Sequence, residues 1–285
     1  MKDDVLKYSK ILRLFSVTFI TLLGLTACND SSDSKSTNTQ QQASSKVPTL
    51  QGKFIPIYEP ALNADNRIEE GLWRSRKLLE GYTEEMNDFV NIPSDIKVIA
   101  KECNEANAFY DSDKKTIELC YELGAEERKM FTEAGDSGVI LENELYQSAV
   151  GTLFHETGHA LIAELDLKIT GREEDVADQL AAYILTYDDQ DKEYLLTVSD
   201  TYGLAARRAT SLDDLLFYDS HSLDAQRAVN FLCYVYGSDP KSFQSLINDE
   251  LLHKERAEDC EHEYQQIVDA WDALLAPYFK KKKNA

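Results

Sequence analysis

Phe-His-Glu-Thr-Gly-His-Ala-Leu-Ile, residues 154–162, is the stretch that decides the fold and the chemistry expected of this chain. His155 and His159 are four residues apart, so on a helix they project from one face and can both bind a single Zn²⁺. Glu156 lies beside them, where it can accept a proton from a water that the metal polarises. Apolar neighbours on both sides predict a helix over residues 141–165. The alternative is two solvated histidines on an amphipathic helix.

A catalytic zinc ion needs a third protein ligand and an open coordination position. Glu174 and Asp178 are four residues apart in a predicted helix over 172–187, on the same inward stripe as Ala177. We expect Glu174 to be the third ligand of one Zn²⁺ per chain, with Asp178 orienting a ligand histidine from behind. Glu173 and Asp175 lie about 100° to either side of that stripe. An acidic helix start that complements the helix dipole explains them.

Four cysteines follow the N-terminal region, and four cysteines allow three disulfide pairings. Cys103 and Cys120 lie symmetrically about a polar turn in a predicted hairpin, so we expect them to face each other across its two strands. Cys233 and Cys260 would then join two C-terminal helices. A zinc site of four cysteines is the alternative, although the chain has no Cys-x-x-Cys pair.

The N-terminus has the pattern of an export signal. Residues 14–27 form an apolar run that is too short for a membrane-spanning helix but typical of a signal peptide. The run ends in Leu-Thr-Ala-Cys at residues 25–28, which resembles the lipobox of bacterial lipoproteins. That resemblance implies cleavage before Cys28 and attachment of a lipid to it. The alternative is an ordinary secretory signal followed by an unrelated cysteine.

The charge balance excludes one class of partner. The chain has 285 residues, with 30 Lys and Arg against 51 Asp and Glu, and a formal net charge of −21. Nucleic-acid binding requires clustered Lys and Arg for the phosphates, so we expect no nucleic-acid partner. The basic run from Lys280 to Lys283 is typical of a solvated tail.

Hydrophobic patterning predicts an α+β fold. Phe54 to Ile57 and residues 96–100 are expected to be strands, with an amphipathic helix over 66–89 between them. The Cys103–Cys120 hairpin should follow, and the chain should then be helical to Phe279. The expected architecture is a small N-terminal sheet beside the active-site helix, with a mainly helical C-terminal half.

Together these motifs resemble the zincin metallopeptidases of the thermolysin-like type, whose third ligand is a Glu in a Glu-x-x-x-Asp helix. The stretch Asn107-Ala108-Phe109-Tyr110 is similar to the edge strand with which such enzymes hold a peptide backbone. The chain also resembles a bacterial family of uncharacterised metallopeptidases over residues 103–276. Both resemblances imply a zincin-like fold and zinc, and neither implies a substrate.

His221 is the candidate for a further catalytic role. In thermolysin-like zincins, a downstream His or Tyr donates a hydrogen bond to the oxyanion of the reaction intermediate. The resemblance implies this role for His221, at the start of a predicted apolar helix, with Arg227 as the alternative donor. A polar residue that merely starts the helix explains His221 equally well.

The sequence therefore predicts four segments. Residues 1–27 are a lipoprotein signal peptide, 28–47 the lipidated cysteine and a disordered tether, 48–279 a zinc metallopeptidase-like domain, and 280–285 a basic tail. We expect an exported bacterial lipoprotein that faces the periplasm or the cell exterior and touches the membrane through its lipid alone. The leading interpretation is a zinc hydrolase of peptide or protein substrates. The alternatives are a zinc-binding lipoprotein without peptidase activity and a zinc amidase acting on a non-protein amide.

Overall fold

The computed structural model describes residues 50–215 and 217–280. The predicted signal peptide, Cys28 and the tether lie outside these residues, as does the tail beyond Lys280. The described part is an α+β fold with a small sheet on its N-terminal side and helices after it, which confirms the predicted fold class. In chain order, the elements are β1 (Phe54–Tyr58), α1 (Ala64–Ser75), α2 (Leu78–Phe89), β2 (Ile96–Lys101), β3 (Ala108–Asp111), β4 (Thr116–Cys120), α3 (Tyr121–Ala134), α4 (Gly138–Glu164), α5 (Glu173–Leu185), α6 (Lys192–Ala206), the short 3₁₀ helix Leu212–Asp214, α7 (Asp224–Ser238), α8 (Ser245–Asn248) and α9 (Lys254–Leu275).

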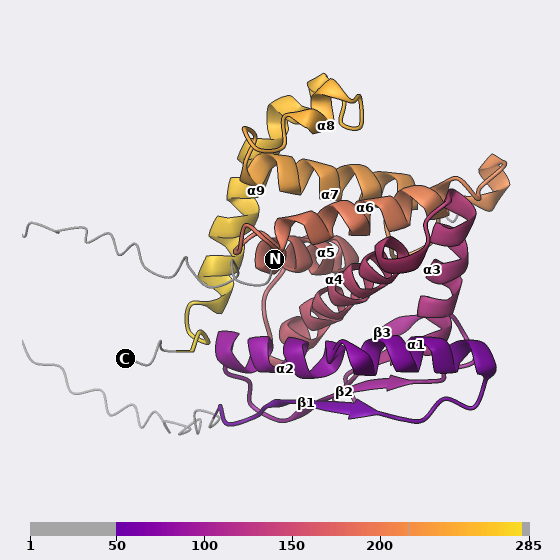
Figure 1. Cartoon of the computed structure of the whole chain (residues 1–285). Helices are drawn as coiled ribbons and strands as arrows, with labels where there is room; N and C mark the ends of the chain where they lie inside the picture. The colour runs from indigo at the N-terminus through magenta and orange to yellow at the C-terminus, as the bar shows by residue number, and fades with distance from the viewer. Residues whose placement is uncertain (1–49, 216, 281–285) are drawn as a thin grey trace, which may run out of the picture. The chain divides into compact units, whose positions relative to one another are not determined.

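The sheet has the strand order β1-β2-β4-β3. The strands β1, β2 and β4 are parallel, whereas β3 runs antiparallel to β4 and forms one edge of the sheet. The helices α2 and α4 cover one face of this sheet (Figure 1). Val98, Ile117 and Leu119 point into that interface and are fully buried, whereas Lys97 is exposed. In β4 the apolar Ile117 and Leu119 alternate with Thr116 and Glu118, so the two apolar side chains share one face of the sheet.

The helix α4 lies between the sheet and the C-terminal helices (Figure 1). It contacts β3 and β4 on one side, and α5 and α6 on the other. Two glycines allow the close approach of its neighbours. A Cβ at Gly158 would lie 2.6 Å from the Cα of Ala177 in α5, and a Cβ at Gly151 would collide with the Cγ2 of Val198 in α6. Both contacts are far shorter than van der Waals separation, so α4 can pack this closely only with glycine at these positions.

The single helix predicted over 66–89 is wrong in one respect, because the chain forms two helices there. α1 ends at Ser75, and Lys77 adopts a left-handed backbone conformation with φ of 54° before α2 begins. The break allows Trp73 before it and both Leu78 and Leu79 after it to be buried. No Gly or Pro marks residues 75–77, so the sequence contains no local signal for this interruption.

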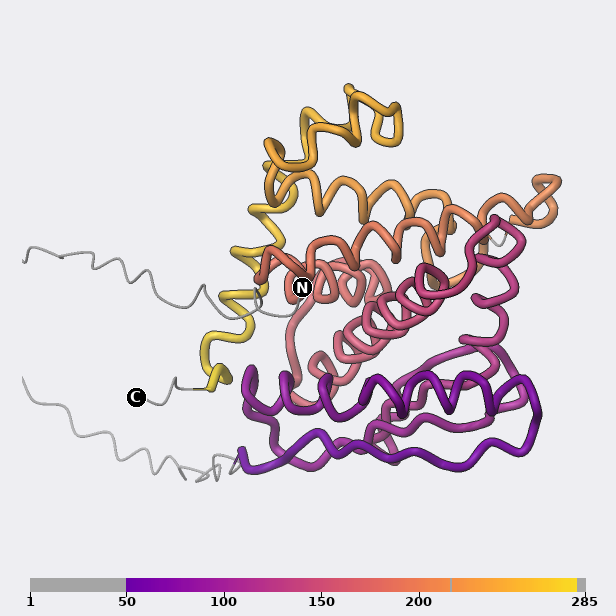
Figure 2. The backbone as a smooth tube through the Cα atoms, in the orientation of Figure 1, coloured from indigo at the N-terminus to yellow at the C-terminus, as the bar shows by residue number. Residues whose placement is uncertain are grey.

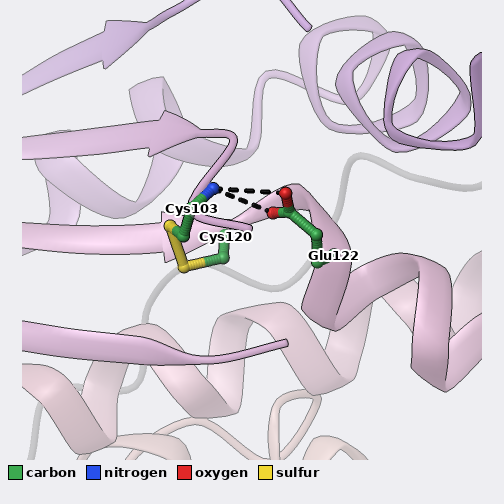
Figure 3. Close-up of side chains that lie close together, drawn as sticks. All are labelled: Cys103, Cys120 and Glu122. Atoms are coloured by element: carbon green, nitrogen blue, oxygen red, sulfur yellow. Dashed lines mark hydrogen bonds between the residues drawn. A yellow bond between two sulfur atoms is a disulfide. The ribbon is translucent and has the colours of Figure 1, made fainter. Parts of the chain in front are cut away.

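Both predicted disulfides are present, Cys103–Cys120 and Cys233–Cys260. The second joins α7 to α9, as expected. The reason given for the first is wrong, because Cys103 lies outside the hairpin, two residues after β2 ends. Cys120 is the last residue of β4, which pairs in parallel with β2 in the register Lys101↔Cys120. The bond therefore ties together the ends of two parallel neighbours (Figure 3).

The C-terminal segment returns to the sheet side of the molecule. Figure 2 traces the yellow end of α9 to the end of α2. There, the backbone N–H of Asn91 donates to the carbonyl of Tyr278 at 2.8 Å, and that of Lys280 donates to the carbonyl of Phe89 at 3.0 Å. None of the described helices is long and apolar enough to cross a membrane.

Candidate metal centre

The close packing of α4 on α5 brings two distant motifs together. Gly158 of the His-Glu-x-x-His stretch lies against Ala177, which is one residue before Asp178 and three after Glu174. Because residues four apart share a helix face, this contact turns Glu174 and Asp178 towards the two histidines of α4. The spatial arrangement therefore follows from one glycine and two helical spacings.

Three side-chain atoms form a small triangle at this contact. The His155 Nε2 atom lies 3.2 Å from Glu174 Oε2, the His159 Nε2 atom lies 3.1 Å from the same oxygen, and the two Nε2 atoms are 3.3 Å apart. A zinc ion with tetrahedral ligands at the usual distances has ligand atoms about 3.3 Å apart. The triangle thus matches one face of a zinc coordination tetrahedron.

The other nitrogen of each histidine is engaged by a carboxylate. The Nδ1 atom of His155 lies 2.7 Å from Asp178 Oδ1, and that of His159 lies 2.9 Å from Glu173 Oε1. An ionised carboxylate can only accept a hydrogen bond, so both Nδ1 atoms carry the proton and donate it. Each Nε2 atom then faces Glu174 Oε2, so two imidazole nitrogens and a carboxylate converge on one point that stabilises a cation, either a proton or a metal ion. The residues present therefore fit a divalent metal ion.

Asp178 is itself held by a buried cation. Arg227 donates from Nε and Nη2 to the two oxygens of Asp178 at 2.8 and 2.7 Å, and its guanidinium lies 3.9 Å from the centre of the Tyr202 ring. Asp178 and Arg227 are both buried. The structure therefore places Asp178 behind His155, where the sequence predicted it. Arg227 is the predicted alternative donor to the oxyanion. Its Nε and Nη2 groups both donate to Asp178 instead.

His221 reaches the triangle from a loop between α6 and α7. Its Nε2 atom lies 3.0 Å from Glu174 Oε2, and its Nδ1 atom lies 2.9 Å from Asp219 Oδ1. The side chain is 43% exposed, so it forms the open side of the site. His155, Glu174 and His221 also form a group whose donor atoms lie close enough to hold one metal ion.

The loop that carries His221 is anchored to the start of α5. Arg172 donates to the backbone carbonyls of Asp219, Ser220 and His221. The Ser222 hydroxyl donates to Asp175 Oδ1 at 2.7 Å. The first turn of α5 therefore supplies a candidate ligand and also fixes the position of the loop.

Glu156 faces a cleft of about 840 Å³ beside the triangle. The side chain is 5% exposed and lines this cleft together with His155 and His221. No other side chain of the described residues forms a hydrogen bond or an ion pair with its carboxylate. A buried carboxylate without such a partner, next to the candidate metal ligands, is free to exchange a proton with a molecule in the cleft.

The predicted substrate strand borders the same cleft. Asn107 and Ala108 line it, and β3, which begins at Ala108, is an edge strand. Phe109 pairs with Glu118 of β4, while the Tyr110 hydroxyl donates to Glu164 Oε1 at 2.9 Å. Asn107 and Ala108 thus lie at the rim of the cleft, and Phe109 and Tyr110 continue from them along the sheet edge.

Burial and charge shift the pKa values of the site in opposite directions. Burial raises the pKa of Glu156, and the nearby histidines oppose this effect. Burial lowers the pKa of His155, but its hydrogen bonds to Asp178 and Glu174 outweigh this and raise the pKa to about 9. Burial also acts on Glu174, yet its three histidine partners hold its pKa well below the usual range. The carboxylate of Glu174 is therefore ionised, and the raised pKa of His155 reflects a ring nitrogen that binds a cation, either a proton or a metal ion, next to that carboxylate.

A second group of potential ligands consists of Cys103, Cys120 and Glu122 (Figure 3). The two thiols are consumed by the disulfide. The Glu122 carboxylate accepts hydrogen bonds from the backbone N–H groups of Cys103 and Asn104. This group therefore closes a turn after β2 and offers no thiolate to a metal.

Sequence reasoning missed part of the support around the triangle. The sequence explains Glu173 and Asp175 by the helix dipole alone, whereas the structure pairs Glu173 with His159 and Asp175 with Ser222. Helical spacing predicts no role for Arg172. Their only sequence signal was the unbroken charged run from 172 to 175 directly before an apolar helix.

Comparison with known families supports a metal-dependent reaction at this site. Residues 58–275 match the family described as "Putative metallopeptidase". No curated protein and no solved structure matches the chain. The matched stretch contains every side chain of the triangle, the carboxylates behind it and the loop of His221. Since the match covers most of the chain, this protein belongs to that family.

Proposed function

We propose that this protein is a zinc-dependent peptidase of the thermolysin-like type. The observation that carries the proposal is the triangle of His155, His159 and Glu174, with edges of 3.1–3.3 Å, next to the buried carboxylate of Glu156. Two imidazoles and one carboxylate are the ligand set of catalytic zinc sites in which the remaining position stays open. A zinc ion bound there would lower the pKa of a water molecule and polarise a substrate carbonyl.

Glu156 supplies the proton transfer in this proposal. Its raised pKa keeps the proton affinity of the carboxylate high enough to accept a proton from the attacking water. The same carboxyl group then delivers that proton to the leaving amine, which would otherwise depart as a poor anionic leaving group. Its position next to His155 makes it a poor metal ligand and a suitable base.

His221 and the edge strand position the substrate. The exposed ring of His221 opens onto the cleft and can donate a hydrogen bond from Nε2 to an oxyanion. The hydrogen bond from His221 Nδ1 to Asp219 holds the ring in place. The edge strand β3 offers unpaired backbone groups to an extended peptide, which would add to the sheet as a further strand.

The decisive experiment compares the purified full-length protein with its Glu156→Gln variant. We expect one zinc per chain in both, because Glu156 lies outside the ligand triangle. Cleavage of a diverse peptide library should fall by about 10² to 10⁴ in the variant, the usual contribution of a general acid–base. Equal cleavage by both proteins would refute this mechanism. Cleavage of non-peptide amides alone would instead favour the amidase.

The ligand assignment has its own test. Replacing His155, His159 or Glu174 by Ala should each remove the zinc, whereas Asp175→Ala is the matched control on the same helix turn. Asp175 contacts Ser222 and not the triangle, so its loss should loosen the His221 loop and leave zinc bound. Zinc content measured by mass spectrometry of the native protein decides between these outcomes.

A second candidate function rests on the position of His221. If its Nε2 atom, 3.0 Å from Glu174 Oε2, completes the coordination, the site has four protein ligands and is closed. The protein would then be a zinc-binding lipoprotein without peptidase activity. His221→Phe separates the two functions. It should weaken zinc binding strongly in the closed site, whereas in the peptidase it should lower kcat by about 10² to 10³ with zinc retained.

We also propose that the protein is an exported lipoprotein that faces the periplasm or the cell exterior. The support is the apolar run that ends in Leu-Thr-Ala-Cys at residue 28, together with two disulfides, which persist in oxidising compartments. If the lipid on Cys28 is the anchor, Cys28→Ser should move the protein from the membrane pellet to the soluble fraction. A variant that stays in the pellet would contradict this assignment.

A further inference from the structure

A buried carboxylate lies in the cleft at a distance from the candidate metal centre. Glu127 of α3 is 5% exposed and lines the same cleft as His155 and Glu156. Its Oε1 atom accepts a hydrogen bond from the hydroxyl of Ser148 in α4 at 2.8 Å. The hydroxyl of Thr201 in α6 lies 3.3 Å from the same serine oxygen. Three helices therefore converge on this carboxylate.

Glu127 has no cationic partner within residues 50–215 and 217–280. The neighbouring buried carboxylate, Glu69, is paired with Arg128, and Glu126 is paired with Arg208 at the cleft. Glutamates are rarely buried without a paired charge, because desolvation of the ionised form is unfavourable. A carboxylate that opens onto a cleft and lacks such a partner is suited to receive one from a ligand.

The spacing along α4 relates Glu127 to the reaction centre. Ser148, which binds Glu127, precedes His155 by seven residues, so both lie on the same face of α4 two turns apart. At 1.5 Å per residue, this separation is about 10 Å. A group bound to Glu127 is thus too far from the metal centre to be the α-amine next to the cleaved bond. It is within reach of a long side chain close to that bond.

The apolar side chains that line the cleft suit the stem of such a side chain. Leu123, Met130 and Val198 line the cleft. Gly151, which lies between Ser148 and His155 on α4, faces Val198 and contributes no side chain of its own. Lys and Arg combine an apolar stem with a cationic end, and they bury the stem against apolar surface while the end finds a polar partner.

We propose that Glu127 is the base of a specificity pocket that binds the cationic side chain of a substrate Lys or Arg. The inference rests on the proposed peptidase function and adds a substrate class to it. The carboxylate would receive the ammonium or guanidinium group, and Ser148 would hold it in position. Glu127 takes no part in the chemical step.

The electrostatics of the pocket agree with this role. Burial raises the pKa of Glu127 to about 8, and the hydrogen bond from Ser148 opposes this shift only in part. A bound cation stabilises the ionised carboxylate and lowers that pKa. A neutral side chain gives no such compensation, so the pocket discriminates by charge as well as by length.

The test uses peptide pairs that differ only in charge at one position, Lys against norleucine and Arg against citrulline. The zinc-loaded wild type should cleave the cationic member with a kcat/KM about 10- to 100-fold higher at one position next to the cleaved bond. Glu127→Gln keeps the shape and should abolish this preference, so that the kcat/KM on each cationic peptide falls to that on its neutral partner. Glu126→Gln, on the same helix and at the same cleft, is the matched control and should keep the preference.

A binding measurement separates this inference from the proposed function. n-Butylguanidinium should raise the melting temperature of the wild type and not of Glu127→Gln, whereas the neutral n-butylurea should raise neither. If the wild type cleaves no peptide but shows this pattern, the peptidase proposal fails and the cation pocket stands. A wild type without charge preference, or without a response to n-butylguanidinium, overturns the pocket, and neither result requires the variant to fold.

Discussion

Asp178 connects a candidate metal ligand with a buried cation. It accepts from His155 on one side and from Arg227 on the other, and all three are buried. A buried arginine that loses its paired charge is strongly destabilising. The orientation of a candidate metal ligand and the stability of the fold are therefore coupled through one carboxylate.

Asp178→Asn should accordingly affect two measurements at once. We expect zinc affinity to fall about 10- to 100-fold, since partners behind a ligand histidine contribute that much. We expect the free energy of unfolding to fall by about 3 kcal/mol, because the charge of Arg227 stays buried without its partner. Zinc competition titration and urea unfolding report the two effects. Glu173→Gln is the control: its side chain is 52% exposed, so the variant should change stability by less than about 0.5 kcal/mol.

Glu127 should give the stability of the protein a measurable pH dependence. Its pKa is raised from 4.5 to about 8 in the folded protein, by burial first and by Glu69 and Glu126 in addition. Between these values, the folded state holds a proton that the unfolded state has released. The free energy of unfolding should therefore fall as the pH rises through this window, by up to about 1.4 kcal/mol per pH unit from this group.

The Glu127→Gln variant isolates that contribution. Urea unfolding of the wild type and the variant between pH 5.5 and 7.5 should give a difference that grows with pH in favour of the variant. Burial also raises the pKa of Glu85, to about 7, and this group adds to the slope in both proteins. Parallel curves for the two proteins would mean that Glu127 titrates as it does in the unfolded chain.

The sequence predicts which side chains meet around the triangle only where residues lie four apart on one helix, because that spacing places them on the same face. His155 and His159, and likewise Glu174 and Asp178, are four apart, so their shared faces follow from the sequence. The pairing of Glu173 with His159 depends on how α4 and α5 pack, which spacing within one helix does not determine. The same limit applies to Glu127, whose neighbours Ser148 and Thr201 come from two other helices.

At the scale of elements, the contact of α4 with α5 sets the geometry of the site. Gly158 lies within the His-Glu-x-x-His stretch and directly opposite Ala177. The two helices can approach closely enough for Glu174 to meet both histidines only because residue 158 lacks a Cβ. Alanine is otherwise the better helix former, so this glycine is retained at the expense of helix propensity.

Gly158→Ala should therefore separate helix stability from site geometry. A Cβ 2.6 Å from the Cα of Ala177 requires the backbones to move apart, which should destabilise the fold by about 1–3 kcal/mol and weaken zinc binding. Gly81→Ala in α2 is the matched control, because a Cβ there would have no atom within 4 Å. That variant should be neutral or more stable by up to about 1 kcal/mol. Unchanged zinc affinity in Gly158→Ala would show that the helices adjust without cost.

The sequence predicts helices correctly where an apolar pattern continues over many residues. It does not predict where such a helix breaks in two. The apolar pattern around residues 141–165 gave α4, which spans Gly138–Glu164. The break at Lys77 has no Gly or Pro to announce it, because burial of the residues on both sides produces it. The disulfide Cys103–Cys120 was paired correctly for the wrong reason, since a parallel neighbour, β2, lies between β1 and β4 and its position depends on the whole sheet.

At the scale of the whole described domain, the last residues join the two ends of the fold. The segment after α9 pairs with the strand entry after α2 through the bridge Val90↔Phe279. The rings of Phe89 and Phe279 also pack, with their centres 5.5 Å apart. The C-terminal helical half is thus fastened to the sheet side by backbone hydrogen bonds from residues far apart in sequence.

Truncation after Leu275 should remove the contacts of Phe279 with Phe89 and Val90 and leave the metal centre in place. We expect a loss of roughly 1–3 kcal/mol in the free energy of unfolding, from the lost hydrogen bonds and the ring contact. Hydrogen exchange should accelerate at Asn91, whose N–H bonds to Tyr278 in the intact protein. Zinc content should remain one per chain. Loss of zinc in the truncated protein would show that this segment supports the site over a long range.

The open edge of β3 also has a consequence for colloidal behaviour. On its outer side, β3 pairs with no strand among residues 50–215 and 217–280, so the groups that would hold a peptide are equally available to the same edge of another molecule. The strand is only four residues long, and a net charge of −21 makes copies repel each other at neutral pH. Near pH 4.6, the isoelectric point expected from the sequence, this repulsion vanishes and no longer opposes edge-to-edge pairing. Solutions of the protein are therefore best kept well above that pH and at low salt.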